Sequence, residues 1–113
     1  MDPNRKFRTA YVTQNVGSFD FSSLLGFCER IVFVTTGYEA EDTLLGTVQK
    51  VLADYDPSLD LLVPVGNVTV NMLIGAVAMV LGKGHGMDNS ITVTFYREQR
   101  YHAVDVWVEK EEM

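Results

Sequence analysis

The longest uncharged stretch of the chain, residues 61–82, changes its pattern in the middle. It begins as an apolar run, which predicts a strand over residues 59–65, and it breaks between Pro64 and Asn67. Residues 68–81 then have helical character and are apolar on nearly all sides, so we expect protein to cover most of this helix. Proline, glycine, asparagine and threonine interrupt the stretch too often for a membrane span, and we predict no contact with a membrane.

The first half of the chain alternates between strand and helix patterns. Residues 9–16 are rich in β-branched and aromatic side chains and predict the first strand. A short helix over residues 21–29 follows, with a serine as its cap. The continuous apolar run over residues 30–36 is typical of a strand that is buried on both faces. After Glu39, apolar residues at helical spacing predict a second helix, which ends before Pro57.

The last third of the chain predicts a β-hairpin. Residues 91–96 and 101–108 alternate as strands do, and the polar segment between them has the length of a hairpin loop. We expect the glycine-rich segment 82–86 to end the preceding helix. The terminal residues, 1–8 and 109–113, are expected to be flexible.

The order of these elements, β-α-β-α-β-α-β-β, predicts one α/β domain over residues 1–113. Helices between successive strands favour a three-layer arrangement around a mostly parallel sheet. The closing hairpin adds an antiparallel pair at one edge of that sheet. The pattern leaves the order of the strands open.

Composition and charge exclude few classes of function. With 47% hydrophobic residues among 113, the chain can build its own core. The single cysteine, Cys28, cannot form an internal disulfide, and no apolar segment follows the basic N-terminus as a secretory signal requires, so we predict a cytoplasmic protein. A net charge of −6 disfavours binding to nucleic acid, whose backbone attracts basic proteins.

Small and amide side chains stand where the parallel strands are expected to end. In such sheets, ligands bind beyond the carboxyl ends of the strands, next to the N-termini of the following helices. We therefore predict a ligand site there, with backbone donors that suit a small anionic ligand. Its candidate residues are Thr13, Gln14, Asn15, Thr35, Thr36, Gly37, Gly66, Asn67 and Thr69. The alternative, that these residues only form turns and helix caps, stays open.

No catalytic or metal-binding pattern accompanies that site. The segment from Gly82 to Gly86 is rich in glycine like a phosphate loop, but it follows a helix, whereas phosphate loops run from strand to helix. Cys28, His85 and His102 are too few for a metal centre, and Cys28 stands among apolar residues as an inert thiol does. We predict no catalytic residue, no metal and no cofactor.

The predicted hairpin holds the densest mixture of aromatic and basic side chains in the chain. Such residues are enriched at binding hot spots, and an edge strand offers unpaired backbone groups to another chain. We predict that another protein, or a second copy of this chain, docks here on Tyr96, Arg97, Arg100, Tyr101 and Trp107. The alternative is that the aromatic side chains only cover the sheet.

Residues 60–67, 75–78 and 95–104, together with residues 11–14, resemble small single-domain proteins of uncharacterised function that tailed bacteriophages encode. The resemblance implies the cytoplasm of an infected bacterium and an accessory or host-directed binding role, and it transfers no site residue. Two functions stay open. The leading hypothesis is a non-enzymatic protein that binds another macromolecule, and the alternative is a domain that binds a small ligand or nucleotide.

Overall fold

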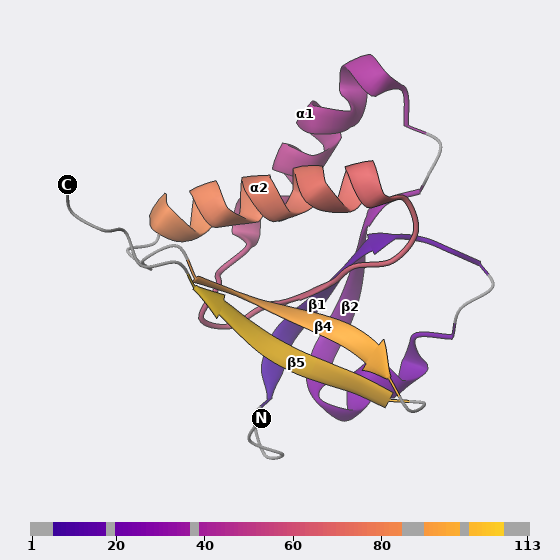
Figure 1. Ribbon diagram of the computed structural model, residues 1–113, viewed down its shortest axis with the longest axis vertical. Helices are drawn as coiled ribbons and strands as arrows, with labels where there is room; N and C mark the ends of the chain where they lie inside the picture. Colours follow the sequence, from indigo (N-terminus) through magenta and orange to yellow (C-terminus); the bar gives the residue numbers. More distant parts are fainter. Residues whose placement is uncertain (1–5, 18–19, 37–38, 85–89, 98–99, 108–113) are drawn as a thin grey trace.

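The computed structural model describes residues 6–17, 20–36, 39–84, 90–97 and 100–107 (Figure 1). Five strands form one sheet in the order β2-β1-β3-β4-β5; the first four strands are parallel, and β5 is antiparallel to β4. The elements of this part of the chain are β1 (Phe7–Gln14), the 3₁₀ helix η1 (Ser22–Gly26), β2 (Cys28–Thr35), α1 (Glu41–Val51), the 3₁₀ helix η2 (Leu52–Asp54), β3 (Leu61–Val63), α2 (Val68–Gly84), β4 (Ser90–Arg97) and β5 (Arg100–Trp107).

The predicted fold class is confirmed: a mostly parallel sheet in a single α/β domain ends in an antiparallel hairpin at one edge. The two α-helices and η1 lie on the faces that right-handed crossovers require. From β1 the chain moves to β2 on one side, and it then crosses back past β1 to β3 and β4. As a result α1 and α2 cover one face of the sheet and η1 covers part of the other (Figure 1). The direction in which successive strands are added to the sheet therefore reverses at β1.

Each face of the sheet has its own hydrophobic core, because side chains alternate along every strand. The core beneath the helices joins sheet residues to α1, η2 and α2, and includes Tyr11, Leu62, Val48, Leu52 and Ile74. The core on the opposite face joins the sheet to the segment around η1, and includes Ala10, Val12, Leu61, Val63, Phe21 and Leu24. Tyr101 and Ala103 of β5 pack against this second core.

The predicted first helix is too long. Only a 3₁₀ turn forms there, and Cys28 and Glu29 belong to β2. Both β1 and β2 begin earlier than predicted, because the Phe7 N–H donates to the Phe27 carbonyl at 2.9 Å and Phe7 pairs with Cys28. Residues 7 and 8, which we expected to be flexible, are therefore part of the sheet.

The predicted end of the last helix is also wrong. α2 begins at Val68 as expected but continues to Gly84. A glycine within a helix costs about 1 kcal/mol relative to alanine, which is too little to end a helix whose hydrogen bonds continue. Residues 85 and 86 of the predicted loop lie outside the described residues.

Two expectations about burial are wrong. β2 is an edge strand, so it has a neighbour on one side only, and Phe33 is exposed rather than buried. α2 is packed on the sheet and beside α1, yet Val68, Met72 and Val80 are 71–72% exposed. Within the described residues, no helix has both the length and the apolar character needed to cross a membrane.

Thr94 is a buried residue of β4 whose hydroxyl has no hydrogen-bond partner among the described residues. An unsatisfied buried hydroxyl destabilises the folded state by about 1–3 kcal/mol. Thr94→Val keeps the shape of the side chain, and we expect it to raise the free energy of unfolding by about 1 kcal/mol in urea denaturation.

Thr13→Val is the matched control for that change. The Thr13 hydroxyl donates to the Val65 carbonyl at 3.0 Å and accepts from the Val65 N–H at 2.9 Å. The same substitution should therefore destabilise the domain at position 13. A loss of stability in Thr94→Val would show that the Thr94 hydroxyl does have a partner.

Candidate functional site

The site lies beyond the carboxyl ends of β1, β2 and β3, and hydrogen bonds between those ends hold it together. The Thr13 hydroxyl joins β1 to Val65, directly after β3. The Thr35 hydroxyl, at the end of β2, donates to the Thr13 carbonyl at 2.8 Å, and the Asn15 N–H donates to the Thr35 carbonyl at 2.9 Å. The three strand ends are thus fixed relative to one another before any ligand binds.

A tight turn leads from β3 into α2 against the side chain of Gln14. Gly66 has φ +78°, a left-handed conformation that glycine adopts without strain. The Asn67 N–H donates to the Gln14 side-chain oxygen at 2.9 Å, and the Asn67 side-chain oxygen accepts the Val70 N–H at 3.1 Å. Asn67 is therefore the N-cap of α2 and also connects it to β1.

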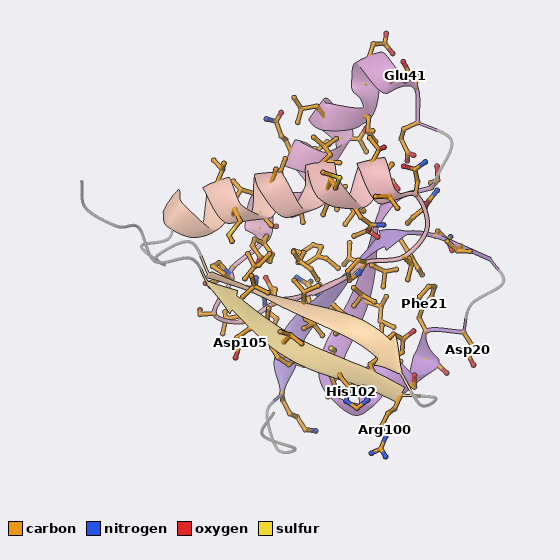
Figure 2. The ribbon with its side chains drawn as sticks, in the orientation of Figure 1. Asp20, Phe21, Glu41, Arg100, His102 and Asp105 are labelled. Atoms are coloured by element: carbon orange, nitrogen blue, oxygen red, sulfur yellow. The ribbon has the colours of Figure 1, made fainter. Side chains whose placement is uncertain are left out.

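The start of α1 encloses the third side of the site. Glu39 precedes the helix and Glu41 is its first residue, at the end of α1 shown in Figure 2. Glu39 accepts hydrogen bonds from the Thr36 N–H at 2.7 Å and the Thr36 hydroxyl at 3.0 Å, which orient its carboxylate. Together these elements form a pocket of about 260 Å³, the carboxyl-edge pocket. Its lining residues are Gln14, Thr35, Glu39, Glu41, Leu44, Asn67, Thr69 and Val70.

The carboxyl-edge pocket has an acidic side and a donor side. The Glu39 and Glu41 carboxylates contribute negative charge, and none of the lining residues is basic. The first N–H groups of a helix have no partner within the helix and carry partial positive charge. In α2, Asn67 accepts the N–H of Val70. Among the described residues this leaves the N–H groups of Val68 and Thr69 without a partner, and Thr69 lines the pocket.

The structure brings together four of the predicted ligand residues as lining of this pocket: Gln14, Thr35, Asn67 and Thr69. Thr13, Asn15, Thr36 and Gly66 do not line it but shape it through the bonds and the turn described above. Gly37 lies outside the described residues.

Sequence reasoning missed the acidic half of the pocket. Glu41 and Asp42 lie in the first turn of α1 and Glu39 lies just before it. Acids near a helix N-terminus stabilise the helix, and that explanation needs no ligand. One signal could have identified Glu39 and Glu41. Both follow shortly after the end of β2, at the same edge of the sheet as Gln14 and Asn67.

The predicted docking hairpin forms the β5 edge of the sheet. Arg100 is exposed, whereas Tyr101 is half-buried and packs against the core on the η1 side. Figure 2 shows Arg100, His102 and Asp105 along β5. For Tyr96, Arg97 and Trp107 the structure describes the backbone alone, so docking on these side chains stays a prediction.

Cys28 and His102 do not meet at the carboxyl-edge pocket. Cys28 is the first residue of β2, at the opposite end of the strand, and His102 is on the far edge strand β5. Burial raises the pKa of Cys28 to about 11, so the side chain is a neutral thiol at physiological pH. Among the residues that the structure describes, no group of three or more His, Cys, Asp and Glu side chains could hold a metal ion.

No protein family, no curated protein and no solved structure matches this chain.

Proposed function

We propose that this protein binds a small polar molecule that carries an amino group, and that the carboxyl-edge pocket is its binding site. The observation that carries the proposal is the pairing, in one pocket, of two glutamates with residues of the first turn of α2. An ammonium group fits beside Glu39 and Glu41. A hydroxyl or carbonyl oxygen of the same molecule accepts from the N–H group of Thr69, which lines the pocket.

The size and charge of the pocket narrow the class of ligand. Pockets for drug-sized molecules measure about 300–1,000 Å³, so a volume of about 260 Å³ suits a smaller metabolite such as an amino alcohol or amino acid. The two carboxylates repel a phosphate monoester, so we propose a cationic or zwitterionic ligand in place of the anionic ligand expected from the sequence. Charge-assisted hydrogen bonds contribute about 1.5–3 kcal/mol each, which corresponds to millimolar to micromolar affinity for a molecule of this size.

The proposed activity is binding without chemical conversion. Nucleophilic attack needs a nucleophile within hydrogen-bond reach of a base. Among the lining residues, the hydroxyls of Thr35 and Thr69 are the potential nucleophiles. The Thr35 hydroxyl donates its hydrogen bond to the Thr13 carbonyl, which is not a base, and the Thr69 hydroxyl has no hydrogen bond with a base among the described residues.

Thermal shift with matched pairs of compounds tests this proposal. We expect ethanolamine and serine to raise the melting temperature at millimolar concentration, and phosphoethanolamine and phosphoserine to raise it less. Thr69→Phe should fill the pocket and abolish the shift, whereas Ser23→Phe, an exposed position on η1, should leave it unchanged. Equal shifts for the phosphorylated and unphosphorylated partners, or for both variants, would contradict the proposal.

Binding of another protein along β5 is a second candidate function. The accessory role that the phage resemblance implies would need such a docking surface. The observation in its favour is that β5 is an edge strand with Val104 and Val106 exposed. A partner that docks there should be released by Val104→Lys and unaffected by Thr69→Phe.

A further inference from the structure

An exposed apolar row runs along α2 from Val68 to Val80. Val68, Met72, Ala76 and Val80 recur every four residues and are all exposed, three of them by more than two thirds. A surface helix of a soluble domain usually shows polar residues on this side. An exposed apolar ridge of this length indicates a surface that another molecule covers.

A groove lies next to this ridge. It separates α1 from α2, has a volume of about 310 Å³, and is lined by Leu45, Gln49, Leu73, Ala76, Val77, Val80 and Leu81. None of these side chains is charged. Leu45, on the α1 side, is itself exposed. Ridge and groove together form one continuous surface, because Ala76 and Val80 belong to both; we call it the α2 face.

We propose that two copies of this chain associate through the α2 face in a symmetric dimer. Rows of residues four apart are the ridges that interdigitate in the commonest class of helix packing, with the axes crossing at about −50°. A two-fold axis at Ala76 pairs identical ridges, because Met72 and Val80 are each four residues from it. Met72 of one copy then packs against the partner's Val80, and the small Ala76 lets the two helices approach closely.

The distribution of charge favours a second copy as the occupant. The chain carries a net charge of −6, so most faces of two copies repel each other. The sequence of α2 contains no acidic residue, and its one charged residue is Lys83, the second-last. A like-charged copy therefore meets the least repulsion at this face. A basic partner protein would instead be drawn to acidic surfaces elsewhere.

The size of the α2 face predicts a weak dimer. A helix of 17 residues is about 25 Å long, and its face is about 10 Å wide. Such a contact is at or below the small end of specific interfaces, which bury about 1,200 Å² in total. We expect a dissociation constant in the micromolar range and an equilibrium that changes with protein concentration.

Sedimentation velocity on the full chain, from low micromolar to high micromolar concentration, tests the dimer. We expect the wild type to shift from monomer to dimer, and Met72→Glu and Val80→Glu to remain monomeric. Leu25→Glu, at a 55% exposed position on η1, and Arg100→Glu on the hairpin should dimerise like the wild type. Circular dichroism confirms that each variant is folded; the mutated side chains on α2 are mostly exposed, so neither change removes core packing.

The remaining outcomes overturn the proposal. A wild type that is monomeric at every concentration excludes the dimer. A dimer that survives both α2 variants, or that is lost in Arg100→Glu, places the contact elsewhere.

As a positive test, Ala76→Cys should form an intermolecular disulfide under mild oxidation, because the two copies meet at this residue. Exposed Ser23→Cys should form one more slowly, and equal rates for the two variants would contradict an axis at Ala76.

Discussion

Replacing Arg8 with methionine is expected to destabilise the domain by about 2–3 kcal/mol. Breaking a fully buried ion pair costs about 3–5 kcal/mol, and the cost is lower here because the Arg8 side chain is 35% exposed and water screens its charge. Asp60 is 0% exposed and accepts from Arg8 Nε at 3.0 Å and Arg8 Nη2 at 2.6 Å. Arg8→Met leaves this carboxylate in the interior with the Asp56 N–H, at 2.8 Å, as its hydrogen-bond donor among the described residues. A change of this size is a large fraction of the total stability of a small domain.

The same arginine also connects distant segments. Its Nη2 donates to the Asp54 carbonyl at 2.7 Å, and its backbone N–H donates to the Leu59 carbonyl at 2.8 Å. The hydrogen bond with Asp60 raises the pKa of Arg8, so its stabilising charge is fully present at any pH below the ordinary pKa of arginine and is lost only above it. The destabilisation by Arg8→Met should therefore be the same at pH 7 and pH 9.

Urea denaturation measures this effect directly. Lys50→Met, at an exposed position on α1, is the matched control and should change the free energy of unfolding by less than about 0.5 kcal/mol. Arg8→Met combined with Asp60→Leu should be more stable than Arg8→Met alone, because it removes the unpaired buried charge. A cost below about 1 kcal/mol for Arg8→Met would mean that water reaches Asp60.

Replacing Gly66 with alanine is expected to destabilise the domain by about 2–3 kcal/mol and to weaken ligand binding. At φ +78° an alanine has a backbone penalty of about 1–2 kcal/mol. Its Cβ would also collide with the side-chain oxygen of Gln14 and lie 2.9 Å from Gln14 Cδ. Gln14 must then move, which breaks its hydrogen bond with the Asn67 N–H, worth about 1 kcal/mol, and reshapes the carboxyl-edge pocket.

Gly46→Ala is the matched control, because a Cβ at this position of α1 meets nothing within 4 Å. Alanine is the better helix former by about 1 kcal/mol, so the same substitution should stabilise the protein there. Because Gln14→Ala removes the colliding atoms, the double variant Gln14→Ala/Gly66→Ala should be more stable than the sum of the two single changes predicts. Strict additivity of the two changes would show that Gln14 does not pack against Gly66.

The residues at the carboxyl edge of the sheet were the part of the candidate site that the sequence allowed us to predict. The ends of strands and the starts of helices leave local signals, such as the turn at Gly66 and the cap at Asn67, and parallel strands bring their carboxyl ends to one edge. The roles of Glu39 and Glu41 were not predictable in this way, because acids at or just before a helix N-terminus have a sufficient local explanation.

Contacts between distant residues were beyond local patterns. Arg8 and Asp60 are 52 positions apart, and neither has a neighbour in the chain that indicates a partner. The place of β2 at an edge follows from the strand order, which the alternation of strands and helices leaves open. The apolar pattern of α2 was visible in the sequence, but it predicted burial, and the single chain covers only part of the helix.

Binding at the carboxyl-edge pocket is the central claim, and an NMR titration with ethanolamine tests it most directly. In ¹H–¹⁵N spectra we expect saturable shifts in the amides of Gln14, Thr35, Asn67 and Thr69, and smaller ones in Leu45, Leu73 and Val80 of the α2 face. Phosphoethanolamine should give weaker shifts at the same concentrations. Absence of saturable shifts up to millimolar ethanolamine, or shifts confined to the α2 face, would contradict the claim.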